Sequence, residues 1–178
     1  EIAVSVADLS AEARAHFALA TALLGLFESS EIWEGFGEVT ESLERAATLY
    51  EQLGTIDFGA TLLTMADAFT MVGELDAAQS VYVRVTRDLA DPRWAAPESI
   101  ARHADFLRGR AFVGLGWNAV HQQLEDQAGE RFEAAVNLLV AAGEPAGAPI
   151  LEEIAAWFEE RANGEAAKQI RAAAQRLA

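Results

Sequence analysis

The segment LERAATLY at residues 43–50 is closely matched by LDAAQSVY at residues 75–82, thirty-two positions further along the chain. Both segments carry an apolar residue, an acid, an alanine, an aliphatic residue and a tyrosine, in the same order and at the same spacing. A recurrence at this interval is typical of proteins built from stacked supersecondary units, in which each unit buries its apolar face against the next. The pair of segments therefore predicts a repeat architecture.

Apolar residues recur at alternating intervals of four and three, which is the period of one face of an α-helix. The clearest such series is Ile32, Phe36, Val39, Leu43, Ala46, Tyr50 and Leu53. Ser30 is a candidate N-cap for this helix, and Gly54 is a candidate end. Alternating strand patterns are hard to find anywhere in the sequence, so we expect an all-α protein.

Capping residues, glycines and prolines divide the sequence into eight expected helices, which form four antiparallel hairpins. Ser10 is expected to cap the first helix, and Pro149 is expected to start the seventh. The two prolines of the segment at 91–97 predict a loop between the second and third hairpins. The expected hairpins lie at about residues 10–54, 58–90, 97–142 and 148–178, within a single domain of residues 1–178.

The seam between the helices of a hairpin is expected to match small residues with large ones, because helices pack closely only in that way. The same register recurs in three hairpins, where an alanine of the second helix follows the first seam residue by sixteen positions. The pairs are Leu62 and Ala78, Phe112 and Ala128, and Leu151 and Ala167. An aromatic residue follows the alanine at Tyr82 and Phe132, while Arg171 takes the corresponding place in the last hairpin.

This register resembles that of the tetratricopeptide repeat, whose turn into the second helix is also similar to GELDAA at residues 73–78. The resemblance is good for residues 58–90, fair for 109–142 and 148–178, and half-present in 10–54. It implies a right-handed superhelix of antiparallel hairpins with a concave surface that binds a peptide or another protein. A generic helical bundle with an alanine-rich seam is the alternative.

The resemblance also implies that the concave face is lined mainly by the first helix of each hairpin. The residues at the corresponding positions are Leu63, Asp67, Met71, Arg110, Val113, Trp117, His121 and Glu152. Tryptophan and arginine are common anchors of interfaces, so Trp117 and Arg110 are expected to hold an apolar or basic protein segment. The alternative is that a neighbouring helix covers Trp117.

A second candidate surface is a series of glutamates at helical spacing, which includes Glu31, Glu34, Glu38 and Glu41. Such a series is either a solvated helix face or a docking surface for a basic partner, including a second copy of the chain.

The composition argues against several functional classes. The net charge of −15 disfavours nucleic-acid binding, which needs a basic surface. The chain has no cysteine, so disulfides and zinc–thiolate sites are excluded. The longest apolar run, residues 17–27, is too short to cross a bilayer. His103 and His121 would lie about 27 Å apart on one helix, too far to share a metal ion.

We therefore expect a non-catalytic scaffold or adaptor without a cofactor or metal, which binds a protein or peptide in its groove. The alternative is a ligand-sensing or oligomerisation domain of a larger bacterial regulator, because residues 50–68 resemble the repeats of such regulators. Twelve arginines stand against one lysine and the chain is rich in alanine, as in proteins from high-GC bacteria, so a bacterial cytoplasmic protein is expected.

Overall fold

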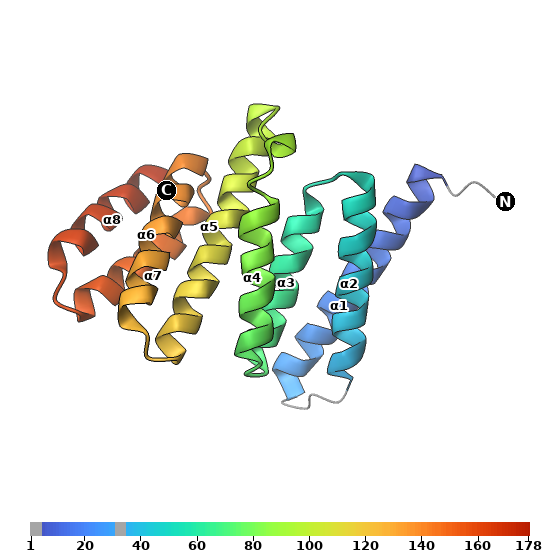
Figure 1. Cartoon of the computed structure of the whole chain (residues 1–178), viewed down its shortest axis with the longest axis horizontal. Helices are drawn as coiled ribbons and strands as arrows, with labels where there is room; N and C mark the ends of the chain where they lie inside the picture. Colours follow the sequence, from blue (N-terminus) through green and yellow to red (C-terminus); the bar gives the residue numbers. More distant parts are fainter. Residues whose placement is uncertain (1–4, 31–34) are drawn as a thin grey trace. The chain divides into compact units, whose positions relative to one another are not determined.

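The computed structural model describes residues 5–178 except residues 31–34, and within this part of the chain it contains helices and no strand (Figure 1). The all-α prediction is confirmed. The helices are α1 (Val6–Ser30), α2 (Phe36–Leu53), α3 (Asp57–Met71), α4 (Leu75–Asp88), the 3₁₀ helix η1 (Pro92–Trp94), α5 (Glu98–His121), α6 (Glu125–Ala142), α7 (Gly147–Glu160) and α8 (Gly164–Leu177). None of the helices described is long and apolar enough to cross a membrane.

The chain divides into two compact units, residues 1–81 and residues 82–178, with the boundary inside α4. In the first unit, α2 packs against both α1 and α3. In the second unit, α5 packs against α6, α7 packs against α8, and α6 also contacts both α7 and α8. The expected hairpin pairs α1 with α2, α5 with α6, and α7 with α8 are therefore seen as contacting helices.

Two helices begin earlier than expected. Ser5 and Asp8 form a reciprocal cap, in which Ser5 Oγ accepts from the Asp8 amide at 3.1 Å and the Asp8 carboxylate accepts from the Ser5 amide at 3.2 Å. Helix α1 thus begins at Val6 and not after Ser10, which lies inside it. Helix α7 begins at Gly147, before Pro149, because proline fits the first turn without being its first residue.

The boundary between α1 and α2 also differs from the expectation. Ser30 is the last residue of α1 and therefore does not cap the next helix. Helix α2 begins at Phe36, directly after Gly35, whose φ of 92° is readily adopted only by glycine. Its predicted end is confirmed, because Gly54 adopts a left-handed conformation and its amide binds the last turn.

The repeated register is buried in the hairpins where it was found. The seam residues with at most 8% exposure are Ala46 and Tyr50 in α2, Leu62, Met65 and Ala66 in α3, Ala78, Tyr82 and Val85 in α4, Leu115 and Ala119 in α5, Ala128, Phe132 and Ala135 in α6, Leu151, Ile154, Ala155 and Phe158 in α7, and Ala167 and Ala174 in α8. The set combines small and large side chains, which allows the helices to pack closely. The sequence echo is therefore a packing feature.

Glycines allow α5 to lie unusually close to its neighbours in the second unit. A Cβ atom at Gly116 would lie 2.5 Å from the Phe132 ring of α6, and one at Gly114 would overlap the Tyr82 ring of α4. Real Cβ atoms essentially never come so near. The glycines of the segment at 112–118 are thus explained by helix packing, and Tyr82 lies against α5.

Candidate functional site

The predicted groove residues of the first unit lie on α3 and differ in exposure. Leu63 is only 1% exposed, so its assignment to a binding surface is wrong. Its apolar side chain belongs to the core, where its removal from water stabilises the fold. Asp67 is half-buried, and Met71, at the end of the helix, is 40% exposed.

In the second unit, the predicted anchor Trp117 is half-buried on α5. Its ring meets the Phe132 ring of α6 edge-on, with 5.1 Å between the ring centroids. A neighbouring helix therefore covers part of Trp117, as the alternative reading held, while part of its surface remains accessible. Arg110 and Val113 on the same helix are also half-buried.

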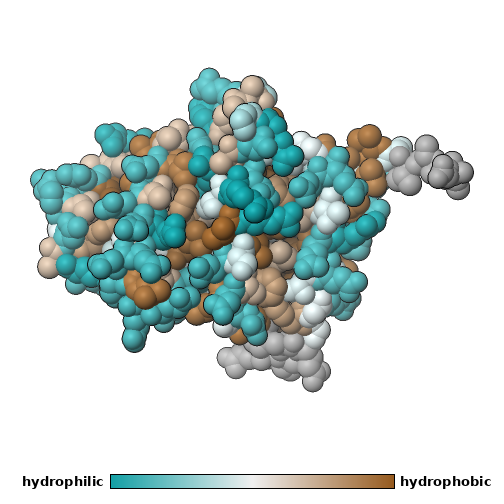
Figure 2. Space-filling view, viewed as in Figure 1, coloured by the Kyte–Doolittle hydropathy of each residue, from teal (hydrophilic) through white to brown (hydrophobic). Residues whose placement is uncertain are grey.

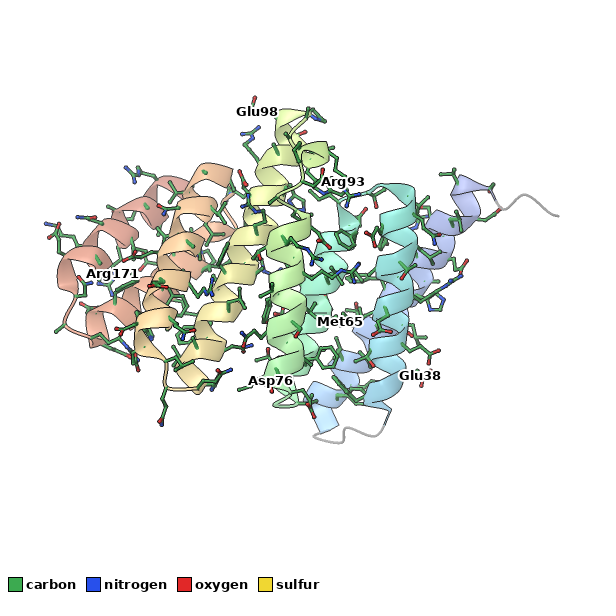
Figure 3. The ribbon with its side chains drawn as sticks, in the orientation of Figure 1. Glu38, Met65, Asp76, Arg93, Glu98 and Arg171 are labelled. Carbon is green, nitrogen blue, oxygen red and sulfur yellow. The ribbon has the colours of Figure 1, made fainter. Side chains whose placement is uncertain are left out.

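The two remaining groove residues are exposed. His121 is the last residue of α5. Glu152 of α7 lies 3.5 Å from Arg171 of α8, and Glu159 accepts a hydrogen bond of 2.5 Å from the same arginine. Arg171, which takes the place of Tyr82 and Phe132 in the repeated register, thus forms ion pairs with two glutamates of α7 (Figure 3).

The acidic series is described only in part. Glu38 and Glu41 are exposed on α2, and Glu38 is labelled in Figure 3. Glu31 and Glu34 lie outside the described residues. On the same helix, Arg45 donates to Glu12 of α1 at 2.6 Å, so a cation already stands beside this face. The face of the molecule in Figure 2 is largely hydrophilic, with smaller hydrophobic areas between.

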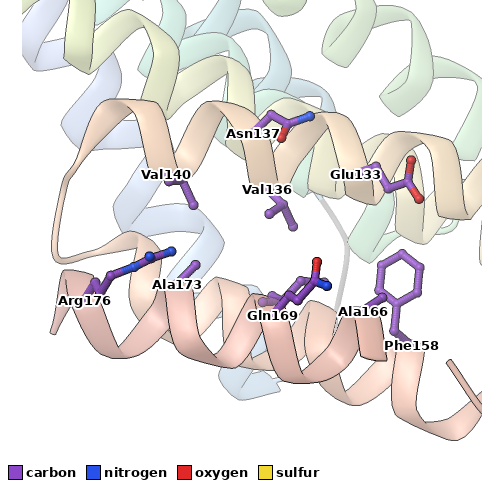
Figure 4. Close-up of a pocket in the computed structure, with 10 residues that line it drawn as sticks. Glu133, Val136, Asn137, Val140, Phe158, Ala166, Gln169, Ala173 and Arg176 are labelled. Atoms are coloured by element: carbon purple, nitrogen blue, oxygen red, sulfur yellow. The ribbon is translucent and has the colours of Figure 1, made fainter. Parts of the chain in front are cut away.

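A groove with a volume of about 420 Å³ runs between α6 and α8, and none of the eight predicted groove residues lines it. Val136 and Val140 of α6 point toward α8, as Figure 4 shows, and Val140 is 38% exposed. The other lining residues are Glu133 and Asn137 of α6, Phe158 of α7, and Ala166, Gln169, Ile170, Ala173 and Arg176 of α8. The groove therefore has an apolar floor and polar edges.

A wider recess of about 950 Å³ lies between α6 and α7. Five acids line it with a single arginine and two aromatic residues: Glu125, Asp126, Glu130, Glu133 and Glu160, with Arg161, Trp157 and Phe158. Gly129 and Asn163 complete the lining. We call this depression the acidic recess and the depression between α6 and α8 the apolar groove.

Arg161 is already engaged within the acidic recess. Its Nε and Nη2 atoms donate to the two carboxylate oxygens of Glu125 at 2.5 and 2.9 Å. Its guanidinium carbon lies 4.1 Å from the centroid of the Trp157 ring. These hydrogen bonds lower the pKa of Glu125 and raise that of Arg161, so both groups stay charged at neutral pH.

The two depressions follow one face of α6. After Glu125 at the start of the helix, their α6 residues recur at helical spacing: Asp126, Gly129, Glu130, Glu133, Val136, Asn137 and Val140. Glu133 of α6 and Phe158 of α7 line both depressions, so these are adjoining parts of one surface. At 1.5 Å per residue this face is about 21 Å long, acidic at the start of α6 and apolar toward its end.

Within the described residues, no group of three or more His, Cys, Asp or Glu side chains could hold a metal ion. Comparisons with family models, with curated proteins and with solved structures found no match. The resemblance to the tetratricopeptide repeat thus stays a prediction, and what the chain itself establishes is an all-helical fold with an acidic and apolar surface along α6.

Proposed function

We propose that the protein is a non-catalytic helical-repeat module of the tetratricopeptide type, which binds a segment of another protein along α6. The observation that carries this proposal is the apolar groove between α6 and α8. Binding sites are concave and mostly apolar, with a few polar groups at their edges. The groove has this composition, with Val136, Val140 and Phe158 inside it and Gln169 among its polar residues.

A segment of a partner protein suits this surface better than a small molecule does. The apolar groove and the acidic recess adjoin, and together they extend along about 21 Å of α6. That length corresponds to about four turns of a helix, or to roughly six residues of an extended chain. An elongated surface of this kind is typical of peptide recognition by helical domains.

Site-directed cross-linking tests the proposal, because the chain has no cysteine of its own. Val140→Cys places one thiol in the apolar groove, and Glu153→Cys places one on the exposed surface of α7 outside the lining of both depressions. Each variant is labelled with a thiol-reactive photo-cross-linker and illuminated in an extract of the organism that makes the protein. We expect a discrete protein adduct from Val140→Cys alone.

A third variant makes the result specific to the groove. Ile170 lies on the α8 side of the groove and is 7% exposed, so Ile170→Ala reshapes the wall that faces Val140. Introduced with Val140→Cys, it should reduce the adduct. The same adducts from Val140→Cys and Glu153→Cys, or none from either, would refute binding in this groove.

A further inference from the structure

We infer that the segment bound along α6 is basic at one end and apolar at the other. Its arginine or lysine side chains lie in the acidic recess, and its large apolar side chains lie between α6 and α8. This inference rests on the proposed function and adds to it the chemistry and the direction of the bound segment.

The charges of the acidic recess are the first reason. Glu125 is paired with Arg161, and Glu160 lies 3.8 Å from the same arginine. Among the residues that the structure describes, no cation pairs with Asp126, Glu130 or Glu133, which lie on successive turns of α6. Three unneutralised carboxylates along about 10 Å of helix attract a basic segment and repel an acidic one.

The aromatic floor of the recess is the second reason. Trp157 is 6% exposed, and Arg161 shows how a guanidinium is accommodated here, on the indole ring and against a carboxylate. Cations bind aromatic faces in this way, and arginine does so most often. The adjacent Gly129 has no side chain, and a Cβ there would lie 3.8 Å from the edge of the Trp157 ring. The recess therefore stays open beside the aromatic ring.

The apolar groove sets the direction of the segment. Val136, Val140 and Ile170 are among its apolar lining residues. Arg176 stands at the end that is far from the recess (Figure 4). A basic side chain of the bound segment at that end would be repelled by Arg176 and would lie against apolar side chains. The basic end of the bound segment therefore lies at the start of α6, and its apolar end lies near Val140.

Synthetic peptides test this inference on the whole chain. The probes are three fluorescein-labelled peptides: one with a block of arginines before a block of leucines and alanines, one with the two blocks reversed, and one with glutamine in place of every arginine. Binding is measured by fluorescence anisotropy at low and at high ionic strength. We expect one of the two arginine peptides to bind, and the glutamine peptide to bind at least about tenfold more weakly.

Protein variants locate the charge effect. Glu130→Lys should weaken binding of the arginine peptide by about tenfold or more, since it replaces attraction by repulsion in the recess. Glu153→Lys makes the same change of net charge on an exposed part of α7 and should leave binding unchanged. Val140→Asp should weaken binding of the arginine peptide and of the glutamine peptide alike. Circular dichroism spectra of the variants confirm that the helices are retained.

Three outcomes overturn the inference. If the glutamine peptide binds as tightly as the arginine peptide, the bound segment need not be basic. If Glu153→Lys weakens binding as much as Glu130→Lys, the attraction is a property of the acidic chain and not of the recess. If neither arginine peptide binds, no basic and apolar segment is recognised. In each case cross-linking at Val140 decides separately whether the groove binds a protein.

Discussion

Replacing Gly116 of α5 by alanine tests how closely α5 and α6 pack. The new methyl group would lie 2.5 Å from Cε1 of Phe132 and 2.7 Å from Cδ1, well inside van der Waals contact. The Phe132 ring has no exposed surface and is held edge-on by Trp117, at 5.1 Å between centroids, and by Trp157, at 4.9 Å. The ring therefore cannot turn aside without disturbing both tryptophans.

The expected change in the free energy of unfolding of Gly116→Ala is the balance of two opposing effects. Overpacking a well-packed core costs about 1–3 kcal/mol, and the enclosed Phe132 ring favours the upper end of that range. Alanine in place of glycine inside a helix stabilises by about 1 kcal/mol. The net loss for Gly116→Ala should be about 2 kcal/mol. If the free energy of unfolding falls by about 2 kcal/mol per molar urea, the urea midpoint of unfolding should fall by about 1 M.

Gly129→Ala is the matched control. Its methyl group would lie at an ordinary 3.8 Å from Trp157, so only the gain in helix propensity remains. Its urea midpoint should rise by about 0.5 M. Tryptophan fluorescence follows mainly the second unit, because three of the four tryptophans of the chain, Trp94, Trp117 and Trp157, lie there.

A double variant identifies the clash as the cause. Phe132→Leu shortens the side chain that the new methyl group meets, so it should relieve part of the loss in Gly116→Ala and give a coupling energy of about 1 kcal/mol or more. If Gly116→Ala is as stable as wild type while Gly129→Ala gains stability, the close approach of α5 and α6 is refuted. Additive effects of Gly116→Ala and Phe132→Leu would refute the contact itself.

Two further predictions concern the seam and the ion pair of the recess. Tyr82→Ala should destabilise the second unit by about 3–5 kcal/mol, since it removes a 97% buried ring that lies against α5; urea unfolding that stays near the wild-type midpoint would contradict the register. Hydrogen bonds from Arg161 lower the pKa of Glu125. At pH values above the ordinary carboxyl pKa this pair therefore stabilises the folded state, and the stabilisation is lost as the pH falls through the lowered pKa. Arg161→Gln should therefore lose less stability than wild type on acidification over that range, and parallel pH–stability curves would contradict the coupling.

The helices and their seams could be predicted because both depend on residues that are close in sequence. A helix face repeats every three to four residues, and the alanines that admit a neighbouring helix repeat with the hairpin. The start of α2 is predicted too early, after Ser30, because the apolar series extends back to Ile32. The structure begins this helix at Phe36, directly after Gly35. The cap at Ser5 was missed because Ser10 also precedes an apolar run, and only the geometry distinguishes the two.

The sequence predicts a binding surface on the helices, but not which residues form it. The resemblance predicts a binding surface on the first helix of each hairpin, where Leu63 is buried. The apolar groove lies instead between two second helices, and its width depends on how far α8 lies from α6, which no local pattern encodes. One signal was available: Val136 and Val140 directly follow the buried residues Ala135 and Leu139, and so widen the apolar stripe of α6 beyond its buried face.

The glycines of the second unit connect stability with the proposed site. A glycine inside a helix costs about 1 kcal/mol relative to alanine, so each one calls for a compensating reason. At Gly114 and Gly116 that reason is contact with an aromatic ring of another helix. At Gly129 packing gives no such reason, since alanine would fit against Trp157 at an ordinary distance. A side chain there would, however, extend over the aromatic floor of the acidic recess. The absence of a side chain at Gly129 thus leaves uncovered the part of the recess that we propose receives a cation.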